Sequence, residues 1–195
     1  MLLVCAIVIV LAASGVKVEA ASAKTKALNA YKKFLAEKEI PWDKNFKIPA
    51  SDCKFAIAYV DNDKIPELIL NTNAVPHMAG YGRIFTYKNG KVKRVGPVEM
   101  DANKFSYYKK TGVFISCYVQ GGVTYSYRKL TKGKIVHKVQ KGEDAFGKKE
   151  YLDSNSKQIS KSTFDKTVKK LVGSKKKTSA KFYKNTASNR KKHCK

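Results

Sequence analysis

Two segments of the chain carry apolar residues at helical spacing. In residues 24–39, KTKALNAYKKFLAEKE, the apolar positions recur three and four residues apart, with lysines and glutamates between them. These positions are Ala27, Leu28, Tyr31, Phe34 and Leu35. The spacing predicts an amphipathic helix over 24–39, and Pro41 is expected to stop it because proline cannot donate the next backbone hydrogen bond.

The second helical segment, SKSTFDKTVKKLVG, covers residues 160–173. Ser162 is the predicted N-cap, with Asp165 three residues later in the position of a capping box, and Gly173 is expected to end the helix. The predicted apolar face consists of Phe164, Val168, Leu171 and Val172.

Between these helices the pattern changes to short β-rich segments spaced about ten residues apart. The predicted strands cover 54–60, 67–72, 82–88, 91–97, 104–108, 113–119, 123–130 and 134–140. Turn signals separate them at Asn89-Gly90, Lys110-Thr111-Gly112, Gly121-Gly122 and Lys132-Gly133. The pattern indicates an α+β fold in which an antiparallel meander of about eight strands lies between an N-terminal amphipathic helix and a C-terminal helix. Exposed sheet edges are a liability, so we expect the meander to close or curl, either as a barrel or as two stacked blade-like sheets.

The first residues have the pattern of a secretory signal peptide. An unbroken apolar run from Leu2 to Ala13 is followed by small residues near Ala20, and the run is shorter than a membrane-spanning helix requires. We therefore predict a signal peptide over 1–20, a single α+β domain over 21–173 and a basic tail over 174–195. Cleavage after Ala23 and an uncleaved N-terminal anchor are the alternatives. The predicted location is extracellular, with retention at the cell envelope as an extension of that prediction.

The chain is strongly basic. Removing residues 1–20 takes away one lysine and one glutamate, so 39 basic and 14 acidic residues remain and the net charge stays +25. Residues 155–195 hold 14 basic residues and one acidic residue. A block of like charge of this kind is typically disordered or surface-bound until it meets an anion. The predicted anion-binding residues are Lys169, Lys170, Lys175, Lys176, Lys177, Lys181, Lys184, Arg190, Lys191 and Lys192.

The charge pattern favours anionic partners and leaves several of them open. An anionic cell-wall polymer, an acidic glycan and a membrane surface all fit, and the alternative is that lysine only keeps the surface soluble. Arginine is scarce, which disfavours sequence-specific recognition of nucleic acid, where bidentate arginine contacts are the rule. The oligomeric state stays open.

The three cysteines of the mature chain, Cys53, Cys117 and Cys194, are an odd number, and we expect free thiols rather than a Cys53–Cys117 disulfide.

One loop contains carboxylates at the spacing of a calcium site. In YVDNDKIPELIL, residues 59–70, acidic residues stand at Asp61, Asp63 and Glu67. The segment resembles the D-x-D-G-D-G-x-P-E-L loops of FG-GAP-like and dockerin-like secreted proteins, in which such carboxylates wrap one calcium ion. The resemblance implies metal ligation by Asp61, Asp63 and Glu67, together with the carbonyl of Ile65.

Two departures from the calcium loop weaken this expectation. Tyr59 stands in place of the first carboxylate, and Lys64 replaces the glycine of the turn while adding a positive charge. We therefore expect the hairpin to be retained and calcium to bind weakly or not at all, so that no cofactor is predicted. A polar β-turn without a ligand is the alternative.

The wider chain resembles uncharacterised secreted proteins of Gram-positive gut anaerobes. The segments that carry the resemblance are AYKKFL, FAIAYVDNDKIPELIL, FTYKNGKVKRV and KFYKNTASNRKK, and they imply a fold type and a location rather than an activity.

No catalytic motif stands out. Glu99 and Asp101 are the one candidate acid pair, and His77, His137 and His193 lie outside any known metal or triad spacing. Alternating strand aromatics could form a platform for sugar rings, but strand aromatics are more often core residues. These aromatics are Phe85, Tyr87, Phe114, Tyr118, Tyr125 and Tyr127.

The expected function is thus a secreted, non-catalytic module that binds anionic polymers. An envelope-acting hydrolase, a glycan-binding protein or a membrane-active protein is the alternative.

Overall fold

The computed structural model describes residues 23–72, 81–100, 104–119 and 121–195. The predicted signal peptide, His77 and Asp101 therefore lie outside the described residues. Among the described residues, no helix combines the length and the apolar character that crossing a membrane requires.

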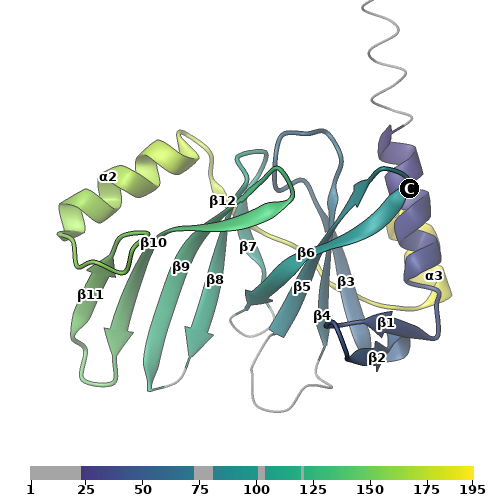
Figure 1. The fold of residues 1–195 in the computed structure, drawn as a ribbon, viewed down its shortest axis with the longest axis horizontal. Helices are drawn as coiled ribbons and strands as arrows, with labels where there is room; N and C mark the ends of the chain where they lie inside the picture. The colour runs from purple at the N-terminus through teal and green to yellow at the C-terminus, as the bar shows by residue number, and fades with distance from the viewer. Residues whose placement is uncertain (1–22, 73–80, 101–103, 120) are drawn as a thin grey trace, which may run out of the picture.

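The first half of the chain forms a five-stranded antiparallel sheet (Figure 1). Its order is β13-β3-β4-β5-β6, so that four consecutive strands form a meander and a strand from the end of the chain adds one edge. The strands are β3 (Cys53–Ala58), β4 (Glu67–Thr72), β5 (Tyr81–Lys88), β6 (Lys91–Glu99) and β13 (Tyr183–Lys184). The turn between β5 and β6 is the predicted one, with Asn89 and Gly90 both at positive φ.

The second half forms a six-stranded antiparallel sheet of order β11-β10-β9-β8-β7-β12. Its strands are β7 (Ser106–Tyr108), β8 (Val113–Val119), β9 (Gly122–Thr131), β10 (Lys134–Asp144), β11 (Lys149–Leu152) and β12 (Lys177–Ser179). All eight predicted strands are present within the two sheets, and the predicted antiparallel meander is confirmed. Neither sheet closes on itself, so the barrel alternative is wrong.

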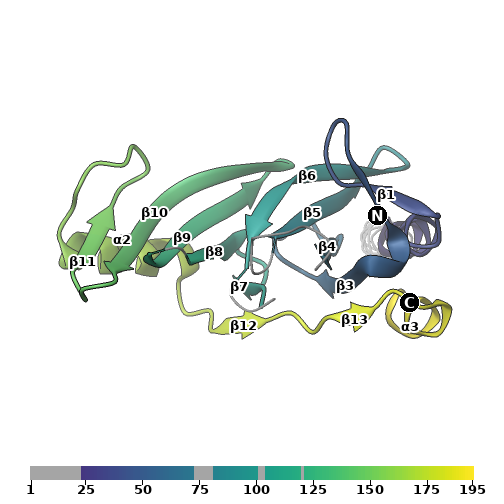
Figure 2. The ribbon, with the colours of Figure 1, turned by 90° about the horizontal axis from the view of Figure 1, so that it is seen from below.

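The two sheets lie side by side along the molecule (Figure 1 and Figure 2) and meet at a shared cluster of buried apolar side chains. Ala56 and Ile69 from the five-stranded sheet share one buried cluster with Phe105, Phe114 and Leu130 from the six-stranded sheet. A second cluster lies on the outer face of the five-stranded sheet, where the N-terminal helix (residues 23–34) covers it. A third lies under helix α2 (Lys161–Val172) on the six-stranded sheet. Because β4 is covered on both faces, all of its residues are buried.

The helix boundaries differ from the prediction at two ends. The N-terminal helix stops at residue 34, and Pro41 lies instead in the short strand β1 (Glu39–Pro41), which pairs with β2 (Lys47–Pro49) ahead of the one-turn 3₁₀ helix Ala50–Asp52. At the start of α2, Ser160 is the N-cap rather than Ser162, because the Ser160 hydroxyl accepts the hydrogen bond of the Thr163 N–H at 3.1 Å. Gly173 ends α2 as predicted, with φ at 59°.

The end of the chain is folded. Residues 174–195, here called the C-terminal strap, contain β12, β13 and helix α3 (Ala187–His193). Of the two alternatives for this basic segment, disordered or surface-bound, the disordered one is therefore wrong. Figure 2 shows the C-terminal strap running along one side of the molecule from α2, past both sheets, to the N-terminal helix. Cys53, Cys117 and Cys194 are buried, and no disulfide links them to one another.

Candidate functional site

The C-terminal strap is held to both sheets by backbone pairing. Strand β12 pairs with β7 in the register Lys177 to Tyr108, and β13 pairs with β3 in the register Tyr183 to Phe55. Between the two strands, the N–H of Ala180 donates to the carbonyl of Phe105 at 2.9 Å. The strap therefore supplies one edge strand of each sheet, and because these edge strands are only three and two residues long, they offer little backbone for pairing with another chain.

A buried asparagine anchors the last part of the C-terminal strap. The Asn185 side-chain amide donates to the carbonyls of Leu35 and Ala50 at 2.8 and 2.9 Å, at the end of the N-terminal helix. Arg190 donates to the Asn185 side-chain oxygen at 2.9 Å, and the Tyr183 and His193 rings stack with centroids 3.5 Å apart. These contacts hold α3 in a fixed position against the start of the domain.

The predicted anion-binding lysines remain exposed to solvent in this anchored arrangement. Of the ten predicted anion-binding residues, the nine lysines are exposed, and Arg190 is half-buried and engaged in the anchor. None of the ion pairs found within the described residues includes any of the ten. The structure thus places nine positive charges without carboxylate partners along α2, β12, β13 and α3.

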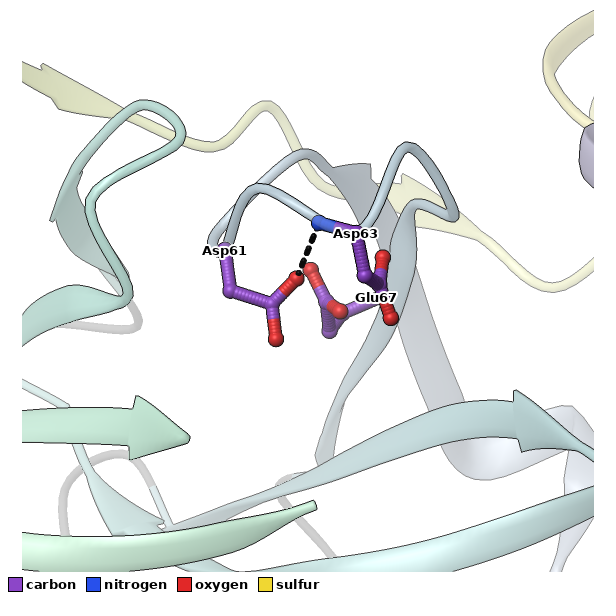
Figure 3. A group of neighbouring side chains, drawn as sticks. All are labelled: Asp61, Asp63 and Glu67. Carbon is purple, nitrogen blue, oxygen red and sulfur yellow. Dashed lines mark hydrogen bonds between the residues drawn. The ribbon is translucent and has the colours of Figure 1, made fainter. Parts of the chain in front are cut away.

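The acidic loop between β3 and β4 also folds as its sequence indicates. Asp61, Asp63 and Glu67 each offer a carboxylate oxygen, and these oxygens all lie within 4.8 Å of one another (Figure 3). The Asp61 carboxylate accepts the N–H of Asp63 at 3.1 Å, and the Asp63 carboxylate accepts the N–H of Ile65 at 2.8 Å. Lys64 adopts φ of 69°, the left-handed conformation that glycine provides in the family loop.

Glu67 is the buried member of this acidic group. It has no exposed surface, its Oε2 accepts the N–H of Val60 at 2.9 Å, and its Oε1 has no hydrogen-bond partner among the residues that the structure describes. Burial and then the charge of Asp61 raise the pKa of Glu67 to about 8. Burial likewise raises the pKa of Asp61 to about 6, with a further contribution from Asp63. The nearby Tyr31 hydroxyl, which donates to the Pro66 carbonyl at 2.9 Å, has a raised pKa through burial and the charge of Glu67.

These three side chains fit a hard divalent cation. Their donors are all carboxylate oxygens, and the buried Oε1 of Glu67, which is unpaired within the described part of the chain, can ligate a cation. Tyr59, at the position of the missing first carboxylate, turns its ring toward Lys109, whose Nζ lies 6.0 Å from the ring centroid. A cation at this loop would therefore be held by Asp61, Asp63 and Glu67, with the remaining positions left to carbonyls and water.

The other sequence candidates have structural roles or lie elsewhere. The Glu99 carboxylate contacts the Ser116 hydroxyl and lies 3.7 Å from the Arg128 guanidinium, and the candidate pair with Asp101 stays untested because Asp101 lies outside the described residues. Among the strand aromatics, Phe85, Phe114 and Tyr127 are core residues, and this alternative is confirmed for them. His137 is partly buried in β10, and His193 is used in the stack on Tyr183.

Together, these features define an exposed basic strap on an α+β fold of two packed antiparallel sheets. No protein-family model matches the chain, and no curated protein or solved structure matches it significantly. The fold and the side chains themselves are thus the basis for the proposals below.

Proposed function

We propose that the protein is a secreted, non-catalytic module that is retained at the cell envelope or matrix by binding anionic polymers through the lysines of α2 and the C-terminal strap. The observation that carries the proposal is the set of nine exposed lysines without carboxylate partners on a folded segment. The net charge of +25 adds a long-range attraction of the same sign.

The folded state of the C-terminal strap matters for this function. An extended chain rises about 3.3 Å per residue, so residues 175–184 span up to about 30 Å of sheet edge. Lysines held along such a line need no ordering when a polymer binds, which reduces the entropy cost of association. A repeating anion, such as a polyol phosphate or a polyuronate, can contact several of them at once.

The test compares two triple variants that remove the same charge from different places. K175Q/K176Q/K177Q removes three exposed lysines at the start of the C-terminal strap. K88Q/K91Q/K93Q removes three exposed lysines of the β5–β6 hairpin. Binding to immobilised poly(glycerol phosphate) is measured over a range of salt concentrations. A lysine near an anionic surface contributes roughly 1 kcal/mol, so the strap variant should bind about 10- to 100-fold more weakly at low salt.

The control variant should lose much less affinity, and the affinity of the unaltered protein should fall as salt rises, because screening acts on exposed charges. Equal losses in the two variants would assign the binding to net charge alone. Binding that is insensitive to salt would rule out the proposed coulombic mechanism.

A second function, cation binding at the β3–β4 loop, is favoured by the unpaired buried Oε1 of Glu67. We propose that this loop takes calcium as a structural ion, with Asp61, Asp63 and Glu67 as ligands. The loop joins two central strands of the five-stranded sheet, so its role would be to stabilise the fold. The calcium titration argued in the Discussion tests this.

A further inference from the structure

The outer face of the six-stranded sheet carries a cross-strand row of aromatic and basic side chains. In the strand registers, Tyr151 of β11 lies opposite Lys141 of β10, Lys141 opposite Tyr125 of β9, and Tyr125 opposite Cys117 of β8. Residues directly opposite one another in antiparallel strands point to the same face. Helix α2 lies over this same sheet (Figure 1) and packs on it through Phe164, and Tyr125, Lys141 and Tyr151 are partly exposed.

Two cavities meet along this row. A cavity of about 580 Å³ lies toward β11 and the start of α2, lined by Tyr125, Lys141 and Tyr151 among others. A second, of about 320 Å³, lies toward β12 and is lined by Lys104, Lys177, Tyr125 and Lys141. Both volumes fall in the range of small-molecule sites, and Tyr125 and Lys141 line both cavities, so the two adjoin; together they are here called the cross-sheet groove.

The two halves of the cross-sheet groove differ in charge. The half near β12 has three lysines, Lys104, Lys141 and Lys177, and none of the described residues that line it carries a carboxylate. None of the ion pairs within the described part of the chain uses these three lysines. This half is suited to an anionic group held by several ammonium groups. The Lys141 Nζ lies 5.4 Å from the Tyr125 ring centroid, so that charge and aromatic ring are side by side.

The half near β11 has a mixed lining. It contains the Tyr151 ring, and also Glu143 and Asp144. The Asp144 carboxylate accepts the N–H groups of Phe146 and Lys148, each at 2.9 Å, and Glu143 lies 3.9 Å from Lys149. Carboxylates beside an aromatic ring accept hydrogen bonds from hydroxyl groups, and they repel a ligand that carries a phosphate on every unit.

We infer that the cross-sheet groove binds an acidic oligosaccharide in which neutral and acidic sugars alternate. The acidic sugar lies on Tyr125 with its carboxylate among Lys104, Lys141 and Lys177, and the neutral sugar lies near Tyr151, with hydroxyl groups toward Glu143. The two tyrosines are two strands apart, about 10 Å at the usual strand spacing, which leaves room for a sugar ring at each. The inference rests on the proposed function through Lys177, which belongs to the C-terminal strap, and it names the class of polymer that this surface selects.

The test uses four probes and two double variants. The probes are a hexasaccharide of alternating N-acetylglucosamine and glucuronic acid, a neutral hexasaccharide of N-acetylglucosamine, poly(glycerol phosphate) and hexathymidylate. Y125L/Y151L keeps apolar bulk but removes both rings, and Y125F/Y151F keeps the rings. Affinities are measured by calorimetric titration, and thermal melts verify that each variant is folded.

The unaltered protein should bind the acidic hexasaccharide at least tenfold more tightly than the neutral one. Y125L/Y151L should lose at least tenfold of that affinity, Y125F/Y151F should retain most of it, and binding of poly(glycerol phosphate) should be equal in both variants. Should Y125L/Y151L be unfolded, K104Q/K141Q replaces it, with the same loss expected.

Three results would overturn the inference: an acidic hexasaccharide that does not bind, equal affinity in the ring-less and ring-containing variants, or tighter binding of hexathymidylate than of the acidic hexasaccharide. In each case retained binding of poly(glycerol phosphate) leaves the proposed function standing. Conversely, if the protein binds the acidic hexasaccharide but not poly(glycerol phosphate), the inference about the cross-sheet groove holds and the proposed function of the C-terminal strap is wrong.

Discussion

Glu67, the first residue of β4, accepts a hydrogen bond from the backbone N–H of Val60 at 2.9 Å, which ties the two ends of the acidic loop together. Only one of its carboxylate oxygens is used in this way. The other is buried without a partner and lies in the group formed with Asp61 and Asp63. A structural hydrogen bond and an unpaired buried oxygen on the same carboxylate make Glu67 the most sensitive position of the loop.

The first prediction concerns pH. The pKa of Glu67 is raised by burial to about 8 in the folded protein, against an ordinary value near 4.5. The fold therefore favours the protonated form of Glu67. The contribution of this group to the free energy of unfolding is fully present below pH about 4.5 and is lost as pH rises through about 8. The loss is at most ~1.4 kcal/mol per pH unit.

Chelator-treated protein should thus resist urea less at pH 8 than at pH 5, and E67Q should flatten this dependence because glutamine stays neutral and keeps an acceptor for Val60. E150Q, which neutralises an exposed glutamate, is the control and should follow the unaltered protein. The raised pKa of Asp61 should leave a smaller pH dependence in E67Q, and a dependence that E67Q does not reduce would show that Glu67 does not cause it.

The second prediction concerns calcium. A cation that binds the folded loop and not the unfolded chain stabilises the fold by about 1.4 kcal/mol when its concentration is ten times Kd. Calcium should therefore raise the Tm of the unaltered protein at pH 8, where Glu67 and Asp61 lose protons most easily, and the gain should be smaller at pH 5. E67Q and D61N should abolish the gain, whereas E150Q should keep it. A Tm that millimolar calcium leaves unchanged would contradict the assignment of this loop as a cation site.

The strands could be predicted from sequence because their signals are local. Asn89-Gly90 and Lys132-Gly133 both adopt the paired positive φ angles of tight hairpin turns, and alternating apolar residues flank them. The pairing of β12 and β13 could not be predicted in the same way. The three residues of β12, Lys177 to Ser179, are all exposed and show no apolar alternation, so only their backbone pairing with β7 makes them a strand.

The same distinction separates the two candidate sites. The acidic loop lies within seven residues of sequence, and its carboxylates converge as the spacing indicates. The cross-sheet groove brings together Lys104, Tyr125, Lys141 and Lys177 from different strands. Their proximity depends on strand order and register, in particular on β12 returning to the sheet edge from the end of the chain, and no local spacing contains that information.

The third prediction concerns the anchor of the C-terminal strap. The Asn185 amide donates to the carbonyls of Leu35 and Ala50 in a buried position, so N185A removes two buried hydrogen bonds, although Arg190 still donates to the Leu35 carbonyl and the Cys53 N–H to the Ala50 carbonyl. Such a change typically costs about 1–3 kcal/mol, and the free energy of unfolding from urea titration should fall by that amount. S188A, which truncates an exposed side chain of α3, is the control and should change the stability by less than about 0.5 kcal/mol. Equal stability of N185A and S188A would mean that the strap is held by its strands alone.

The last prediction concerns the packing of α2 against the six-stranded sheet. Phe164 is 4% exposed and contacts two tyrosines of the sheet, with ring centroids 5.6 Å from Tyr127 and 5.3 Å from Tyr151. F164A removes a buried aromatic ring and leaves a cavity, for which the expected loss is about 3–5 kcal/mol. F164L refills part of that cavity and should cost much less, while S162A on the exposed side of the helix should have almost no effect. Urea titrations of the three variants measure these differences. A loss below about 1 kcal/mol in F164A would indicate that α2 contributes little to the stability of the six-stranded sheet, and that Tyr151 is positioned by its strand rather than by the helix above it.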